Sequence, residues 1–281
     1  MEERGENLMA TITVSRQIGS LGTEIARETA RILGYDYVDK ERMEKLLSRS
    51  GFPELEIRKF DERKPPFWDS LALERRKFLH STQAIIYELA RKGKVVIVGR
   101  GGQVLLRDVP GILHVRVISP FEVRVKRMVE SGGFEEKQAA RFVRQGDQES
   151  FGFIHTFFHV DWNDPSLYDL VVNTGKISVE TAVRWIAEAV QSSNMAEREE
   201  ETRERLADLA LIQRVEARLM DVVGNDIRLV EVEARQGVVT LKGSIASSRG
   251  RENCERAVAE LDGVLRVENN LAVAQFYRLG P

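Results

Sequence analysis

The fold is decided by residues 10–33, which read ATITVSRQIGSLGTEIARETARIL. Residues 11–14 form a short run of β-branched and apolar side chains, which predicts a buried strand. Apolar side chains then recur at helical spacing over residues 24–33. The loop between them, residues 15–23, contains Gly19 and Gly22. This order of strand, glycine-containing loop and helix can hold a phosphate, because backbone N–H groups at the start of the helix point at the anion.

The loop lacks one part of an ordinary P-loop. The pattern G-x-x-x-x-G-K-[ST] requires a lysine that reaches the outer phosphates of the nucleotide. Thr23 follows Gly22 here, so that lysine is missing. The sequence therefore predicts a phosphate loop whose cations must be supplied by other residues.

Composition limits the class of protein. A length of 281 residues suffices for one large domain, or for a medium domain with a small one. A net charge of −2 gives no electrostatic reason to expect nucleic acid as a partner. The single cysteine, Cys254, excludes an intrachain disulfide and a cysteine-based metal site. We expect a cytoplasmic protein, because the first residues are polar and no apolar run is long enough for a transmembrane segment.

Strands and helices alternate over roughly the first 190 residues. Short apolar runs predict buried parallel strands at residues 11–14, 35–38, 95–98, 113–118 and 170–172. Helical patterns separate them, notably at residues 70–91, 120–130, 135–146 and 179–190. This alternation predicts an α/β domain, a parallel sheet with helices on both faces, over residues 10–192. Ligands then lie beyond the carboxyl ends of the strands, where the loop of residues 15–23 also falls.

The pattern changes after this domain. Residues 193–205 are almost entirely polar and charged, which is typical of a solvated helical or flexible linker. Residues 206–275 then show helix, strand, strand, helix and strand patterns. This order predicts a separate small α+β (α-β-β-α-β) domain with antiparallel strand pairing.

Longer motifs carry two resemblances. Residues 12–17 (ITVSRQ), 34–41 (GYDYVDKE), 98–102 (VGRGG) and 161–174 (DWNDPSLYDLVVNT) resemble the cytidylate kinase-like family, a group of P-loop nucleoside monophosphate kinases. Residues 237–243 (GVVTLKG) and 261–271 (LDGVLRVENNL) resemble a BON domain. The first resemblance implies ATP-dependent phosphoryl transfer to a nucleoside monophosphate such as CMP, with ATP and Mg²⁺. The second leaves the ligand or protein partner of the small domain open.

Phosphoryl transfer needs cations on the non-bridging oxygens of the phosphates. The candidate catalytic cations are Arg16, Arg127, Arg141 and Arg144. The resemblance places Arg16 in the phosphate loop, and it places Arg141 and Arg144 one helical turn apart in a mobile lid. Local pairing remains an alternative for Arg16. An exposed helix face with weak surface ion pairs remains an alternative for Arg141 and Arg144.

A second set of residues is expected to contact the nucleotides: Ser15, Gly19, Ser20, Gly22, Thr23, Asp39, Arg100 and Asn173. The resemblance puts Arg100 at the acceptor nucleotide. Thr23 is a candidate Mg²⁺ ligand, although the role of a helix N-cap explains it better. Asp39 fits either an acceptor contact or an N-cap. Asn173 fits either the adenine edge of the donor or a turn.

The phosphate loop also departs from the family pattern. Members of the family usually read GSGGRE where residues 19–24 read GSLGTE. Leu21 thus replaces a glycine at a position that can require a positive φ, and Thr23 replaces an arginine. Three functions remain open: a kinase, a catalytically degenerate module that senses a nucleotide or phosphate and is coupled to the BON domain, or a scaffold that binds no ligand.

Overall fold

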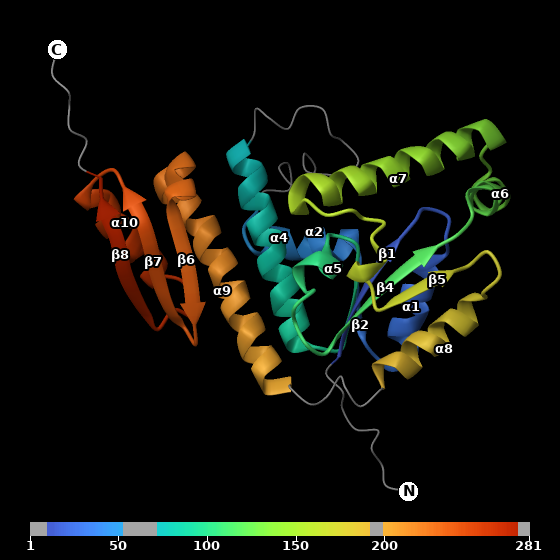
Figure 1. The fold of residues 1–281 in the computed structure, drawn as a ribbon, viewed down its shortest axis with the longest axis horizontal. Coiled ribbons are helices and arrows are strands. Elements are labelled where there is room, and N and C mark those ends of the chain that lie inside the picture. The colour runs from blue at the N-terminus through green and yellow to red at the C-terminus, as the bar shows by residue number, and fades with distance from the viewer. Residues whose placement is uncertain (1–9, 53–71, 192–198, 275–281) are drawn as a thin grey trace, which may run out of the picture. The chain divides into compact units, whose positions relative to one another are not determined.

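The computed structural model describes residues 10–52, 72–191 and 199–274. Contacts divide the chain into two compact units (Figure 1). The first comprises residues 1–66 and 92–202, and the second comprises residues 67–91 and 203–281. No helix in these described ranges has the length and the apolar character that crossing a membrane requires.

The first unit contains a parallel sheet. Its strands are β1 (Thr11–Arg16), β2 (Asp36–Val38), β3 (Val95–Val98), β4 (Ile112–Ile118) and β5 (Leu170–Asn173). They lie in the order β2-β3-β1-β4-β5, and every neighbouring pair is parallel. The expected strands and the α/β class are confirmed. Because all strands run the same way, the loops after β1, β3 and β4 meet at one edge of the sheet.

Helices cover both faces of this sheet. They are α1 (Gly22–Leu33), α2 (Lys40–Arg49), α5 (Gly102–Leu105), α6 (Phe121–Gly132), α7 (Glu136–Phe158) and α8 (Val179–Val190). Helices α1 and α8 lie side by side (Figure 1), and they bury one core with the strand residues Ile12 and Val14. On the opposite face α5 packs on β1, where a Cβ at Gly102 would lie 3.2 Å from the Thr13 methyl group.

Helix α7 is longer than the sequence pattern predicts. The expected helix ended at Gly146, whereas α7 continues to Phe158. Gly146 lies within this helix and packs against the phosphate loop. A Cβ at this position would lie 2.0 Å from Cδ1 of Ile18. The helix thus uses its glycine to let the phosphate loop approach, and the glycine does not end the helix.

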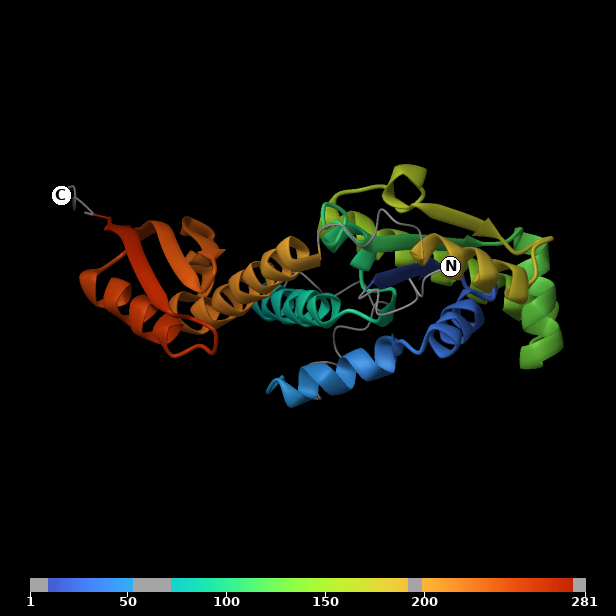
Figure 2. The ribbon, with the colours of Figure 1, turned by 90° about the horizontal axis from the view of Figure 1, so that it is seen from below.

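The described part of the second unit contains a three-stranded sheet and three α-helices. Its elements are α4 (Ala72–Lys92), α9 (Glu199–Val223), β6 (Val230–Arg235), β7 (Val238–Ile245), α10 (Ser248–Ala259) and β8 (Arg266–Val273). Helices α9 and α10 cover the same face of the sheet (Figure 2) and share its apolar core. Strands β6 and β7 are antiparallel, but β7 and β8 are parallel. The expectation of antiparallel pairing is therefore wrong for the last strand, because α10 crosses over between β7 and β8 and returns the chain in the same direction.

Helix α4 belongs to this second unit although its sequence lies between β2 and β3. Lys77 Nζ lies 2.6 Å from a carboxylate oxygen of Asp221 on α9. His80 Nδ1 lies 2.9 Å from a carboxylate oxygen of Glu216, also on α9. Helix α9 itself begins at Glu199, so residues 199–205 of the expected linker are helical, and residues 193–198 lie outside the described residues.

Candidate functional site

The phosphate loop follows β1 and depends on two glycines. Gly19 has a φ of 76°, and a Cβ there would lie 3.1 Å from the backbone oxygen of Arg124 on α6. A Cβ at Gly22 would lie only 2.4 Å from Cβ of Arg16. Both positions therefore require glycine, the first for its backbone conformation and for close approach, the second for close approach alone.

Leu21 ends the loop in a left-handed conformation. It has φ 63° and ψ 16° and is the N-cap of α1, without a side-chain capping hydrogen bond. The expectation that this position takes a positive φ is confirmed. The alternative in which Thr23 caps the helix is wrong, because α1 already begins at Gly22. Leu21 therefore offers no side-chain acceptor to the first amides of α1, and the residues that carry them, Gly22, Thr23 and Glu24, line a cavity.

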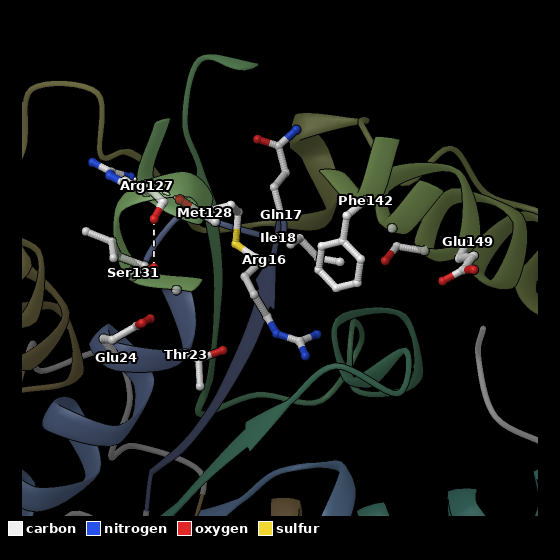
Figure 3. A pocket seen from close by; sticks show the side chains of 15 residues that line it. Arg16, Gln17, Ile18, Thr23, Glu24, Arg127, Met128, Ser131, Phe142 and Glu149 are labelled. Atoms are coloured by element: carbon white, nitrogen blue, oxygen red, sulfur yellow. Dashed lines mark hydrogen bonds between the residues drawn. The ribbon is translucent and has the colours of Figure 1, made fainter. Parts of the chain in front are cut away.

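A cavity of about 370 Å³ adjoins the loop (Figure 3). It is enclosed by the loop and the start of α1, by α6 and by α7. Its lining residues are Arg16, Gln17, Ile18, Gly19, Leu21, Gly22, Thr23, Glu24, Arg127, Met128, Ser131, Phe142, Gly146, Glu149 and Ser150. The space is large enough for a small ligand, because ligand pockets span about 300–1,000 Å³.

Arg16, the last residue of β1, reaches this cavity (Figure 3). Its half-buried side chain makes no hydrogen bond or ion pair with any residue that the structure describes. It also lines a second, smaller cavity of about 20 Å³, together with Ser15, Gly99, Arg100, Gly101, Gln103, Ser150, Phe153, Ile154 and Trp162. Arg16 and Ser150 are thus shared by the two cavities.

Arg127 lines the larger cavity, and its side chain also forms hydrogen bonds to neighbouring segments of the chain. One guanidinium nitrogen donates to the Gly19 carbonyl at 3.2 Å and to the Thr174 hydroxyl at 3.0 Å. The other donates to the Thr174 carbonyl at 2.7 Å. Arg127 therefore ties the phosphate loop to the end of β5.

Arg141 and Arg144 are exposed on α7, and neither lines a cavity described above. The Arg144 guanidinium lies 4.9 Å from the centre of the Phe121 ring. The side chains that α7 does bring to the larger cavity are Phe142, Glu149 and Ser150.

Arg100 lies at the end of β3 in an unusual turn. Gly99, Arg100 and Gly101 have φ values of 77°, 57° and 73°, so three successive residues are left-handed. The Arg100 side chain is buried, and its Nη2 lies 3.6 Å from a carboxylate oxygen of Glu44 on α2. Only the second cavity includes Arg100 in its lining.

The polar side chains of the remaining predicted residues form hydrogen bonds within the protein. Ser15 accepts a hydrogen bond from Trp162 Nε1 at 2.8 Å, and Ser20 donates to the Gln17 carbonyl at 2.7 Å. Asp39 is the N-cap of α2 and accepts from the Arg42 amide at 3.1 Å. The Asn173 side chain accepts from the Gly175 amide at 2.9 Å, which is a turn contact. Neither Asp39 nor Asn173 lines either cavity.

A partly buried ion pair that the sequence patterns did not predict lies behind the loop. The Arg124 guanidinium on α6 donates two hydrogen bonds to the Asp147 carboxylate on α7, at 2.9 and 2.8 Å. It also donates to the carbonyls of Ser119 at 3.0 Å and Ile18 at 3.2 Å. This single side chain joins α6, α7 and the phosphate loop. Nothing in the sequence marks these residues, because they lie 23 positions apart on two different helices.

The donor atoms of the larger cavity fit Mg²⁺. Thr23 contributes a hydroxyl oxygen, and Glu24 and Glu149 contribute carboxylates. These are the hard oxygen donors that Mg²⁺ prefers. In the described parts of the chain, no three His, Cys, Asp or Glu side chains gather into a metal site. The arrangement therefore suits an ion held partly by protein oxygens and partly by substrate phosphates.

Comparison with known proteins gives consistent results. A model of the cytidylate kinase-like family matches residues 11–176, and a model of the BON domain matches residues 207–275. A cytidylate kinase of Pyrobaculum aerophilum is 31% identical over 180 residues, which are 63% of this chain and 90% of that protein. A cytidylate kinase of Pyrococcus horikoshii is 25% identical over 180 residues, which are 64% of this chain and 87% of that protein. The crystal structure of an uncharacterized protein from Eubacterium ventriosum has a similar fold, with a TM-score of 0.51, 21% identity, and coverage of 65% of this chain and 99% of that one.

Proposed function

Because the chain belongs to the cytidylate kinase-like family, we propose that it transfers the γ-phosphoryl group of ATP to a nucleoside monophosphate such as CMP. A nucleotide kinase-like function is common to the family. The acceptor, the donor and the activity of a loop without lysine are our proposal. The observation that carries the proposal is that Arg16 lines two adjoining cavities.

The larger cavity suits the triphosphate of the donor. The first residues of α1 and Arg16 line the same space, so a polyphosphate bound there would meet backbone N–H donors and a cation together. The smaller cavity, which Arg100 lines, is then assigned to the acceptor. At about 20 Å³ it is far too small for a nucleotide, so acceptor binding requires the α7 side chains Phe153 and Ile154 to move.

The chemistry needs little covalent help from the protein. An oxygen of the acceptor phosphate attacks the γ-phosphorus, the bond to the bridging oxygen breaks, and ADP leaves. Arg16 lies where it can neutralise charge on the transferred group in the transition state, when stabilisation is most effective. Thr23 would help to hold Mg²⁺ through its hydroxyl, and the ion would supply further charge neutralisation when bound.

One observation favours a second candidate, a module that binds a nucleotide without turning it over. Arg16 and Arg127 are the only basic side chains in the described lining of the larger cavity. Arg127 already donates its hydrogen bonds to Gly19 and Thr174. One remaining cation is sufficient to bind a phosphate, but phosphoryl transfer generally uses several cations to stabilise the transition state.

The test is turnover of CMP, dCMP and UMP by the full chain with ATP and Mg²⁺, followed in a coupled assay. We expect turnover of at least one acceptor. R16A should lower kcat/KM about 10- to 160-fold, because a charged hydrogen bond contributes roughly 1.5–3 kcal/mol. R31A is the matched control, because Arg31 lies at the other end of α1 and pairs with Glu28. ATP binding in calorimetry without turnover of any acceptor would instead establish the degenerate module.

A further inference from the structure

The first unit buries an arginine that the phosphate loop does not use. Arg116 lies on β4, opposite Ser15 of β1 in the sheet register, and only 4% of its surface is exposed. One guanidinium nitrogen donates to the Trp162 carbonyl and to the Tyr168 hydroxyl, the latter at 2.8 Å. The other donates to the Asn163 side-chain oxygen at 2.9 Å. Every one of these acceptors is neutral.

No carboxylate in the described ranges pairs with this guanidinium. Among the residues that the structure describes, Arg116 forms no ion pair. Its guanidinium instead lies 4.1 Å from the centre of the Trp162 ring and 5.2 Å from that of Tyr168. Hydrogen bonds and ring faces stabilise the cation but do not cancel its charge. A positive potential therefore extends into the surrounding low-dielectric space.

That space includes the second cavity. Trp162 and Ser15 both line it, and Trp162 Nε1 donates to the Ser15 hydroxyl at 2.8 Å. The Tyr168 hydroxyl donates to the Trp162 carbonyl at 2.9 Å. Arg116 thus lies directly behind two wall residues and fixes one of them by both a hydrogen bond and ring stacking.

We propose that Arg116 is a positioning residue for the acceptor: it holds Trp162 and Ser15 in the cavity wall, and its unbalanced charge makes the cavity select an anionic monophosphate over an uncharged nucleoside. This inference rests on the proposed function, because it assigns the second cavity to the acceptor. In this role Arg116 does not contact the acceptor. It acts by positioning the wall residues of the second cavity and by the positive potential of its guanidinium.

The test compares CMP with cytidine in calorimetric titrations of the full chain. The wild-type chain is expected to bind CMP more tightly than cytidine. R116M removes the charge and should lower the affinity for CMP about tenfold, while the affinity for cytidine changes less than about twofold. R116K keeps the charge and should restore most of the preference. Y168F is the matched control, because it removes a hydrogen-bond partner of Arg116 and leaves the charge in place.

R116Q serves as a second uncharged variant if R116M does not fold, since glutamine can still donate to the Trp162 carbonyl. Equal loss of CMP and cytidine affinity in the uncharged variants would overturn the inference, because a merely structural role weakens both ligands alike. An unchanged preference would overturn it as well. A charge-dependent preference without any turnover supports the role of Arg116 and overturns the transferase proposal, so the two failures are distinguishable.

Discussion

Replacing Asp147 with alanine is expected to destabilise the first compact unit by about 3 kcal/mol. The substitution removes the carboxylate that accepts both hydrogen bonds from Arg124 and leaves the arginine in place. Only 4% of the Arg124 side chain is exposed, whereas 27% of the Asp147 side chain is. The variant therefore leaves a buried cation whose remaining acceptors are the carbonyls of Ser119 and Ile18.

The magnitude follows from burial. At 2.8 Å the attraction between the two charges is about 6 kcal/mol for an effective dielectric constant of about 20. Removing both ions from water costs several kcal/mol each, so the intact pair adds little net stability. Removing one partner alone typically costs about 3–5 kcal/mol, because the other charge remains buried. The partial exposure of Asp147 admits water beside Arg124, which places the expected value at the lower end of that range.

Thermal unfolding measures the effect. A loss of about 3 kcal/mol should lower Tm by about 6–12 °C for a unit of this size. E28A is the matched control, since Glu28 accepts two hydrogen bonds from Arg31 at 2.8 and 2.6 Å in the same bidentate geometry. That pair is exposed on α1, so its loss should leave Tm nearly unchanged.

A fall in Tm of equal size in E28A and D147A would refute this reasoning, because geometry alone would then decide the stability. The double variant R124M/D147A adds a second check. It removes both charges, so it should be more stable than D147A. A double variant less stable than D147A would show that the buried charge is not the source of the cost.

Three further outcomes are expected. G22A should weaken ATP binding in calorimetry, because the added methyl group would lie 2.4 Å from Cβ of Arg16, whereas G152A meets no atom within 4 Å and should leave ATP affinity unchanged. Burial lowers the pKa of His114 below its ordinary value of 6.5, so His114 takes up a proton more readily in the unfolded chain than in the folded one. The free energy of unfolding should therefore fall as the pH drops below about 6.5. Chemical denaturation of H114Q should show a smaller decrease of this free energy over the same pH range. A fragment ending at Asn194 contains the proposed first domain but lacks α9, so hydrogen exchange over α4 should be much faster than in the full chain, and equal protection would contradict the packing of α4 on α9.

Much of the first unit was predictable from local patterns. The strands are β-branched and apolar over a few residues, and a buried parallel strand requires no more than that. The positive φ of Leu21 was also predictable, because the family that the loop resembles usually has glycine at this position. Local sequence predicted the end of α7 wrongly. The local pattern ends the helix at Gly146, but this glycine lies inside the helix, where its missing side chain leaves room for Ile18.

The site was only partly predictable. Sequence placed Arg16 and the glycines in the loop, and the structure adds that Arg16 lines two cavities at once. In the structure neither Arg141 nor Arg144 lines these two cavities, because both arginines lie on an exposed face of α7. Spacing along a helix indicates which side chains share a face, but the packing of that helix determines which face meets the ligand.

The sequence by itself determined the separate strands and helices, their alternation, the phosphate loop and the second, smaller α+β region, because each of these patterns is local in the chain. Only the tertiary structure decided that Arg124 meets Asp147, that Arg116 is buried against the Trp162 ring, and that α4 packs on α9. These contacts join residues 23 to 144 positions apart. Their strength depends on burial and orientation, and both of these arise only when distant elements pack together.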